Sequence, residues 1–334
     1  MKKIEVHTKE KTYPIYYGHG ILKNASELIG RKNVFLVSDD GVPEKWRKML
    51  QDQFPQAQMY VFPNGEAHKN VETLLGILAS MQKVHLSRKD TVIALGGGVV
   101  GDMAGFAAAI YMRGIPYINI PTTTISEIDS SIGGKTAVDF NGVKNNIGAF
   151  HQPDMVLIDP EVLTTLPKRH LHNGLAEAVK AGLIRDPALF AIFEKENWKD
   201  HLDEIILRSL EMKRQIVEND EKETGERKLL NFGHTFGHGF EAYFDLDTYL
   251  HGECVAMGMM KILNNEEIKD RLRKVLNHLS LPTECDYDPE AVYQLMLNDK
   301  KAAHDHITMV QVDEIGKAYL TDWSLEDVRK RLGL

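Results

Sequence analysis

The sequence is short of cysteine, of long apolar runs and of positive charge, and each shortage excludes a class of protein. Its 334 residues hold only two cysteines, Cys254 and Cys285, which rules out a disulfide framework and a sulfur-rich zinc knuckle. No run approaches the roughly 20 apolar residues of a membrane span. The net charge of -8 disfavours nucleic-acid binding, which needs a basic surface. We therefore expect neither a membrane nor a nucleic acid as partner, and any metal must bind histidine and carboxylate.

The N-terminus and the chain length set two further expectations. Residues 1–7 alternate like an edge strand and lack the apolar core and cleavage site of a secretory signal. This favours a cytoplasmic location. A chain of 334 residues is also longer than a usual single domain, so we expect two domains sharing a cleft.

The first half of the chain alternates short apolar runs with helical patterns. The runs are continuous and bounded by breakers, as buried parallel strands are, and they lie at 33–38, 59–62, 91–95, 117–120 and 155–158. Helical patterns cover 71–86 and 99–111. Alternation of this kind predicts an α/β domain.

A glycine-rich loop, Gly96 to Asp102, follows one of these strands and opens a helix. Bare backbone N–H groups at such a position hold phosphate. The string matches GxGxxG, but the acidic residue expected about 20 positions later is replaced by Pro121-Thr122-Thr123-Thr124. Two interpretations remain: a glycine turn needed only for tight packing, and the pyrophosphate site of a non-standard dinucleotide-binding domain, which we favour.

Two lysines follow in glycine-punctuated segments, Lys135 in 129–136 and Lys144 in 144–148. A lone lysine is usually a solvated surface charge. Loops after the carboxyl ends of strands are, however, where α/β sheets bind ligands. We therefore expect both lysines in loops that face an anionic substrate.

The second half of the chain is mostly helical and carries the histidines. His234 and His238 stand four apart, as on one helix face, and His251 follows in His251-Gly252-Glu253. Spacing alone predicts a metal site at these imidazoles, against the alternative of chance or core histidines. Arg227 and Asn231 precede at the same spacing, so we expect one continuous helix face from Arg227 to His238.

Other charged residues of this half stand on predicted helices. Glu177 and Lys180 are three apart, a spacing that a surface ion pair also explains, and Lys213 lies in the pattern at 203–217. The chain ends with a predicted strand at 307–312 and an amphipathic helix at 325–332.

Taken together, and in order from about Phe62 to Lys301, these motifs resemble the 3-dehydroquinate synthase family, the sugar-phosphate cyclases of the shikimate pathway. The resemblance implies a fold of class α/β plus α. An NAD-binding α/β domain with a parallel sheet would occupy 1–160, and a mainly α-helical metal- and substrate-binding domain 161–334. It also implies a homodimer with NAD and one divalent metal, Zn²⁺ or Co²⁺, per subunit.

The resemblance assigns roles to individual residues. The metal ligands are Glu177, His234 and His251. The resemblance thus makes His238 a substrate-binding and proton-transfer group and not a metal ligand. Substrate and catalytic groups are Arg113, Asp129, Lys135, Asn145, Lys180, Lys213, Arg227, Asn231, His238 and Lys300 or its neighbour Lys301. NAD contacts are Asp39, Glu66, Lys69, Gly98, Val99, Val100, Gly101, Asp102, Thr122, Thr123, Lys135, Lys144, Val162, Leu163, Thr164 and Thr165.

The sequence departs from the family pattern at a few positions. Gly41 stands where a polar residue is frequent, the run 124–127 replaces a more apolar one ending in an amide, and Asp139 stands where asparagine is common. No proposed metal ligand is lost.

The implied activity is that of a carbon–oxygen lyase acting on a phosphorylated keto-acid sugar. It converts 3-deoxy-D-arabino-heptulosonate 7-phosphate to 3-dehydroquinate and phosphate with catalytic NAD. Alternatives are another sugar-phosphate cyclase of the same fold and a metal-dependent NAD polyol dehydrogenase, which would accumulate NADH. A catalytically dead nucleotide-binding or scaffold protein is disfavoured, because all three metal ligands are present.

Overall fold

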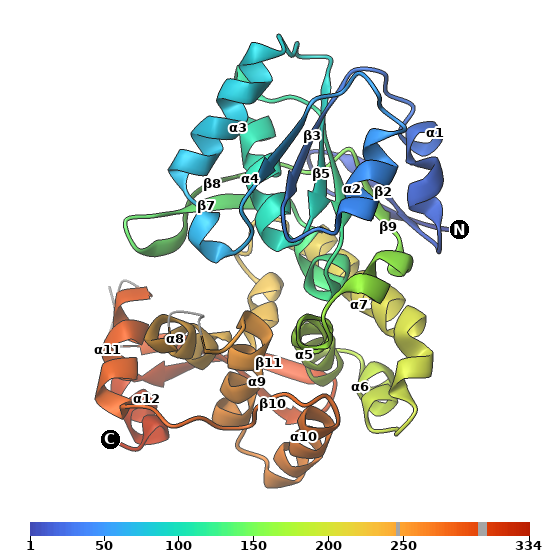
Figure 1. The fold of residues 1–334 in the computed structure, drawn as a ribbon. Coiled ribbons are helices and arrows are strands. Elements are labelled where there is room, and N and C mark those ends of the chain that lie inside the picture. The colour runs from blue at the N-terminus through green and yellow to red at the C-terminus, as the bar shows by residue number, and fades with distance from the viewer. Residues whose placement is uncertain (245–247, 300–305) are drawn as a thin grey trace. The chain divides into compact units, whose positions relative to one another are not determined.

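The computed structural model describes residues 1–244, 248–299 and 306–334. The chain divides into two compact units, Met1–Pro167 and Lys168–Leu334, called here the N-terminal and C-terminal units (Figure 1).

The described part of the N-terminal unit is built on a seven-stranded sheet in the order β1-β2-β9-β6-β5-β3-β4. All neighbouring strands run parallel except β1 and β2. The five apolar runs predicted as parallel strands are confirmed, and the predicted edge strand is β1. The strands are β1 Lys2–His7, β2 Thr12–Tyr17, β3 Val34–Asp39, β4 Met59–Phe62, β5 Thr91–Gly96, β6 Tyr117–Pro121 and β9 Met155–Ile158.

Helices pack on this sheet because their apolar residues recur at helical spacing. Figure 1 shows α1 and α2 on one side of the strands and α3 on the other. The α-helices are α1 Ala25–Ile29, α2 Glu44–Gln51, α3 Val71–Lys83 and α4 Gly98–Ile110. Small residues let α4 approach closely: a Cβ on Gly105 would lie 2.5 Å from the Thr136 side chain. Short 3-10 helices span Ile21–Asn24, Glu66–His68, Tyr111–Arg113 and Pro160–Thr165, and a π-helical turn spans Ser126–Ser130.

A separate antiparallel ribbon is formed by β7, Lys135–Phe140, and β8, Val143–Phe150. The expectation that Lys135 and Lys144 lie in loops is therefore wrong, since both lie on ribbon strands. The reason is local: Asn141 and Gly142 both adopt positive φ, 50° and 75°, as a two-residue hairpin turn requires. That turn reverses the chain and pairs the two segments.

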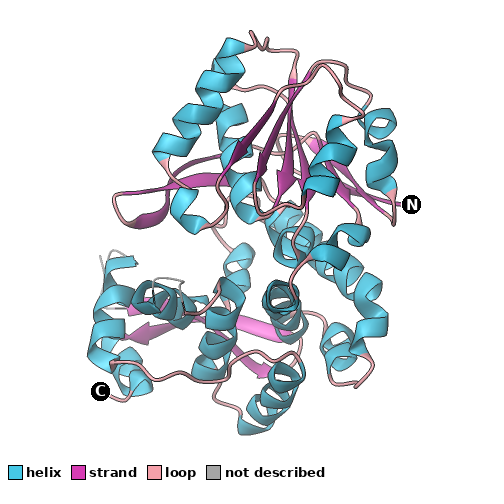
Figure 2. Ribbon diagram, viewed as in Figure 1, coloured by secondary structure: helices cyan, strands magenta, loops and turns pink. Residues whose placement is uncertain are grey.

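The C-terminal unit is mainly helical with one described strand pair (Figure 2). Its helices are α5 Lys168–Ile184, α6 Pro187–Phe193, α7 Leu202–Asn219, α8 His234–Phe244, α9 His251–Ile262, α10 Glu266–His278, α11 Pro289–Asp299 and α12 Leu325–Leu332. Strands β10, His306–Glu314, and β11, Lys317–Ser324, form the hairpin. 3-10 helices span Trp198–His201 and Glu226–Asn231. Among the described residues, no helix has both the length and the apolar character needed to cross a membrane.

The expected continuous helix face from Arg227 to His238 is wrong. Arg227 and Asn231 lie on the 3-10 helix Glu226–Asn231, and α8 begins only at His234. Gly233 breaks the chain between them with φ of 79°. A Cβ at Gly233 would lie 2.9 Å from the carbonyl oxygen of Val255, so close packing against α9 requires glycine there.

Candidate metal centre and nucleotide-binding residues

Three helices of the C-terminal unit bring the predicted metal ligands together. Glu177 lies on α5, while His234 and His251 are the first residues of α8 and α9. Helix α9 packs against both α5 and α8, and glycines allow the approach. A Cβ on Gly258 would lie 2.0 Å from the carbonyl oxygen of Gly233, and one on Gly252 only 1.9 Å from that of Asn173.

The three side chains converge as ligands of one ion would. Nε2 of His234 lies 3.6 Å and Nε2 of His251 3.5 Å from Oε1 of Glu177. That oxygen is buried, and no described residue donates a hydrogen bond to it. Buried polar atoms are nearly always paired, so the orphaned oxygen fits a divalent cation as its missing partner. One carboxylate and two imidazoles suit zinc and other divalent metals.

The Nδ1 atom of each imidazole, on the side of the ring away from Glu177, contacts an oxygen atom. Glu241, on α8, contacts His251 Nδ1 through Oε1, and the carbonyl oxygen of Phe232 lies 3.2 Å from His234 Nδ1. These contacts leave each Nε2 directed at Glu177, the usual arrangement behind metal-binding histidines. The sequence reasoning missed Glu241. Its spacing, three residues after His238 and seven after His234, was the available signal, because those positions share a helix face.

Burial and neighbouring charges together set the pKa values of this cluster. Burial alone would raise the pKa of Glu177, but Lys180, His234 and His251 hold it well below its usual range. Burial, with the Lys180 charge, lowers the pKa of His234. His251 is also buried, yet Glu241 and Glu177 raise its pKa to about 10. The centre therefore keeps Glu177 charged in a buried place, as a metal ligand must be, and His251 would release a proton on binding the metal.

Further predicted residues of this unit lie on elements that adjoin the centre. Lys180 contacts Oε2 of Glu177 and is 2% exposed, so this is a buried pair and not the surface pair that its spacing also allowed. Lys213 on α7 and Arg227 are buried, and α5 packs against α7 and the 3-10 helix of Arg227. The ring of His238 lies 5.4 Å from that of His234 and 6.3 Å from that of His251, between centroids.

Asn231 has an acidic partner that sequence reasoning also missed. Its side-chain nitrogen donates to Oε1 of Glu223 at 2.7 Å. Glu223 adopts a positive φ of 58°, which is uncommon for a residue other than glycine. Its position within a polar turn gave no signal of this contact.

In the N-terminal unit, predicted NAD-binding and substrate residues meet at Lys69. The Lys69 ammonium lies 2.6 Å from Oδ2 of Asp102, 2.6 Å from Oδ1 of Asn145 and 3.7 Å from Oε1 of Glu66. Burial alone would lower the pKa of Lys69, but Asp102 and Glu66 raise it above its usual value. Lys69 is 5% exposed, so the cluster holds a buried charge paired on several sides.

The glycine loop has the strand–turn–helix context that phosphate binding needs. Gly98 to Asp102 form the first turn of α4, whose N-cap Gly97 offers no side-chain hydrogen bond. Thr122 and Thr123 follow the adjacent strand β6, and Thr122 N–H donates to the Gly96 carbonyl oxygen at 2.9 Å. The first N–H groups of a helix lack partners within it. A nucleotide phosphate at this turn remains a prediction.

Other predicted NAD contacts lie beside strand ends. Asp39 ends β3, accepts a hydrogen bond from Val42 N–H at 3.1 Å, and has its pKa raised by burial. Val162, Leu163, Thr164 and Thr165 form most of one 3-10 helix, where Thr165 accepts from the Trp46 indole at 2.7 Å.

The remaining predicted residues are more exposed or fall outside the description. Lys135, Lys144 and Arg113 are exposed, Arg113 with a positive φ of 69°. Asp129 is half-buried in the π-helical turn. Lys300 and Lys301 lie outside the described residues.

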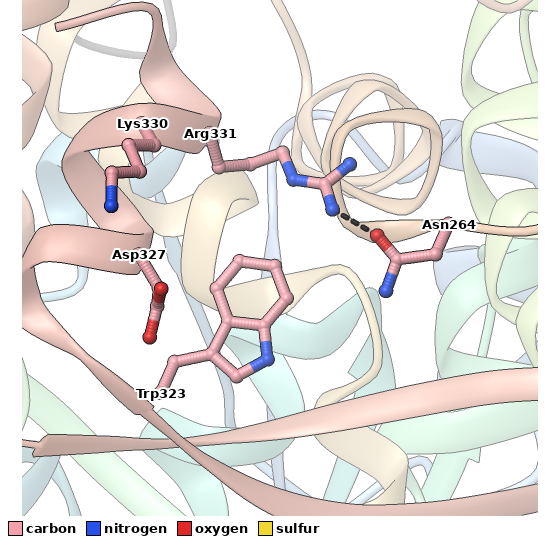
Figure 3. Close-up of a pocket in the computed structure, with 5 residues that line it drawn as sticks. All are labelled: Asn264, Trp323, Asp327, Lys330 and Arg331. Carbon is pink, nitrogen blue, oxygen red and sulfur yellow. Dashed lines mark hydrogen bonds between the residues drawn. The ribbon is translucent and has the colours of Figure 1, made fainter.

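A hollow of about 550 Å³ in the C-terminal unit is lined by none of these candidates (Figure 3). Its lining residues are Asn264, Trp323, Asp327, Lys330 and Arg331. Arg331 bonds Asn264 and lies over the Trp323 ring, and Asp327 caps α12 by accepting from Ser324. These groups serve the packing of α12, so we assign no ligand to the hollow.

Comparison with known families shows which family the chain belongs to. Residues 59–173 match the family described as 3-dehydroquinate synthase N-terminal, and residues 174–302 match 3-dehydroquinate synthase C-terminal. The chain belongs to the 3-dehydroquinate synthase family. A 3-dehydroquinate synthase of Clostridium acetobutylicum is 39% identical over 99% of both chains, and one of Halorhodospira halophila is 40% identical over 95% of this chain and 94% of its own.

Solved structures share the fold of the chain. A 2-epi-5-epi-valiolone synthase of Streptomyces hygroscopicus with NAD⁺ and Zn²⁺ bound has a TM-score of 0.88 at 28% identity, covering 98% of this chain and 97% of its own. A 2-deoxy-scyllo-inosose synthase complexed with carbaglucose-6-phosphate, NAD⁺ and Co²⁺ has a TM-score of 0.90 at 23% identity, with 99% of both chains covered. The second likeness concerns the fold alone. Both confirm the predicted fold class.

Proposed function

We propose that the protein converts 3-deoxy-D-arabino-heptulosonate 7-phosphate to 3-dehydroquinate and phosphate, with NAD⁺ as a catalytic cofactor. The observation that carries the proposal is the complete set Glu177, His234 and His251 around an orphaned carboxylate oxygen, in a chain of the 3-dehydroquinate synthase family. A nucleotide-binding protein without activity would not need to preserve this set.

Glu177, His234 and His251 would hold a divalent metal, Zn²⁺ or Co²⁺. When bound, the metal supplies Lewis acidity at substrate oxygens, and NAD supplies the acceptor and later the donor of a hydride. Glu241 and the Phe232 carbonyl fix the orientation of the two imidazoles. Lys180 keeps the second oxygen of Glu177 paired, so the free oxygen is the one directed at the metal position.

The cationic side chains near this centre suit an anionic substrate. Lys180, Lys213 and Arg227 are buried cationic side chains on elements of this unit that pack together. We propose that they bind the phosphate and carboxylate groups by charge-assisted hydrogen bonds, for which guanidinium is well suited. Asn231 donates a hydrogen bond to the substrate in place of Glu223, and His238 carries a proton to or from it.

NAD would bind the N-terminal unit. The first turn of α4 presents backbone N–H groups for the pyrophosphate, and Lys69 and Asp102 supply side-chain contacts. The domain roles proposed from the sequence, NAD binding in 1–160 and metal and substrate binding in 161–334, belong to this proposal.

A homodimer in the cytoplasm completes the proposal. Four apolar side chains of the ribbon, Phe140, Val143, Ile147 and Phe150, are 36–44% exposed. Exposed apolar side chains along one ribbon favour a protein partner, and a second copy of the chain is the one we propose. Sedimentation at micromolar concentration tests it: a monomer would refute this part alone.

The activity is tested by incubating the metal-loaded protein with catalytic NAD⁺ and the heptulosonate phosphate. We expect release of phosphate, formation of 3-dehydroquinate and no net NADH. Accumulating NADH would instead indicate a dehydrogenase. Glucose 6-phosphate, which lacks a carboxylate, serves as the comparison substrate. Preferential turnover of it would indicate another cyclase.

A further inference from the structure

Asp139 lies at an irregular point of the ribbon and contacts two predicted site residues. The pairing register of β7 and β8 shifts between Val138 and Phe140, which places Asp139 in a bulge. Bulges redirect side chains and are frequent beside active sites. The Asp139 N–H donates to the Lys69 carbonyl oxygen at 2.8 Å, and Asp139 Oδ1 accepts from the Asn145 N–H at 2.7 Å.

These two bonds close a ring of contacts with Lys69 and Asn145. The Lys69 ammonium donates to Oδ1 of Asn145 at 2.6 Å. Asn145 adopts a left-handed φ of 52°, a conformation that persists only where its surroundings hold it. The bond from its N–H to Asp139 is a contact that holds it, since a backbone donor is fixed to a carboxylate on the facing strand.

We propose that Asp139 is a positioning residue: its carboxylate fixes the backbone of Asn145 so that the Asn145 amide meets Lys69. The inference rests on the proposed function, in which Lys69 and Asn145 contact NAD and substrate. Asp139 touches neither ligand in this assignment and acts through Asn145. The role needs an acceptor at Oδ1 and no charge, so asparagine at this position would serve equally.

Asp139 also carries a charge that acts on neighbouring site residues. The negative charge of Asp139 acts to raise the pKa of both Lys69 and Glu66. Removing the carboxylate therefore changes the charge that acts on Lys69 and Glu66 and also removes the hydrogen bond to Asn145. Comparing Asp139→Asn with Asp139→Ala separates the charge from the hydrogen bond.

A double-mutant cycle tests the proposal. Asp139→Ala, Asn145→Ala and the double variant are prepared, with Asp139→Asn as the conservative variant and Asn146→Ala, an exposed neighbour on β8, as the matched control. The readouts are the NAD⁺ dissociation constant by calorimetry and kcat/KM for phosphate release. We expect Asp139→Ala to lower kcat/KM about tenfold, as the loss of a hydrogen bond to a charged group does. Asp139→Asn and Asn146→Ala should stay within about twofold of the wild type.

The decisive comparison is in the Asn145→Ala background. There the positioned side chain is absent, so Asp139→Ala should add less than about twofold. Fully additive losses, or a tenfold loss in Asp139→Asn, would overturn the positioning role. Should Asp139→Ala not fold, Asp139→Leu removes the acceptor while keeping the branched shape of the side chain, and the same cycle is run with it.

The proposed function and the positioning role of Asp139 can be refuted by different results. A wild-type protein that binds NAD⁺ but releases no phosphate would refute the activity, and the cycle would still be read from NAD⁺ affinity. A wild-type protein with full activity and an additive cycle would refute only the role of Asp139.

Discussion

Glu241 contacts Nδ1 of His251, while Nε2 of the same ring lies 3.5 Å from Oε1 of Glu177. One imidazole thus stands between two buried carboxylates, which are 4% exposed each. The first carboxylate orients the ring, and the second shares with it the position of the metal. Glu241 is therefore tied to metal affinity without being a ligand.

Changing Glu241 should weaken metal binding. Contacts of this kind contribute about 10- to 100-fold to metal affinity. We therefore expect Glu241→Ala to weaken metal binding by about 100-fold, and Glu241→Gln, which keeps an acceptor, to weaken it by about tenfold. Competition with a chromophoric chelator measures the dissociation constant of Zn²⁺ or Co²⁺. Glu284→Gln, at an exposed position of the same unit, is the control. Unchanged affinity in Glu241→Ala would contradict the orienting role.

Removing a metal ligand should reduce metal binding more than removing Glu241, which only orients a ligand. His234→Ala leaves Glu177 and His251 as the only proposed protein ligands. We therefore expect the variant to lose its bound metal and, with it, the ability to release phosphate from the substrate. Metal content after dialysis, measured by atomic emission, checks the first, and the phosphate assay checks the second. His278→Ala, at an exposed position, should retain both. Full metal content in His234→Ala would show that the ligand set is wrong.

The sequence predicted much of the fold because apolar periodicity reports burial directly. The five parallel strands are buried runs bounded by breakers, and α12 spans the predicted residues 325–332. The trio Glu177, His234 and His251 was assigned through family resemblance. Spacing alone would have given both His234 and His238 to the metal, since positions four apart share a helix face.

What the sequence did not predict depends on contacts between distant segments. Lys135 and Lys144 read as loop residues because polar and glycine residues surround them, yet their segments pair across a two-residue turn. The break at Gly233 is set by the approach of α9, which no local pattern reports. The hydrogen bonds from Asn231 to Glu223 and from Asn145 to Asp139 were also not predicted. Each depends on a turn or a bulge that brings the acidic side chain to its asparagine.

The crossing of α8 and α9 should not tolerate a methyl group at Gly258. A Cβ there would lie 2.0 Å from the Gly233 carbonyl oxygen and 2.8 Å from the Gly237 nitrogen. Both are backbone atoms, so a helix must move, and overpacking of this kind costs about 1–3 kcal/mol or more. We expect Gly258→Ala to lower the urea midpoint of unfolding and to weaken metal binding. Asn277→Ala, at an exposed position of α10, is the control and should change neither.

His172 should make stability depend on pH outside the metal centre. The side chain lies on α5, is 4% exposed and contacts the Leu279 carbonyl oxygen through Nδ1. Burial lowers the pKa of His172, and the charges of Lys168 and Lys199 act in the same direction. The unfolded chain, with a histidine pKa of about 6.5, therefore binds the proton more readily than the folded protein.

Protonation of His172 then favours unfolding as the pH falls. Its contribution to stability is complete above about pH 6.5 and is lost as the pH decreases through the lowered folded-state pKa. We expect the urea midpoint of the wild type to decrease between pH 7.5 and pH 5.5. His172→Gln should begin about 1–3 kcal/mol less stable, as the loss of a buried contact predicts, but should show a smaller decrease over this range. His278→Gln, whose histidine is exposed, should follow the wild type. An equal pH dependence in His172→Gln and the wild type would show that His172 does not titrate in unfolding.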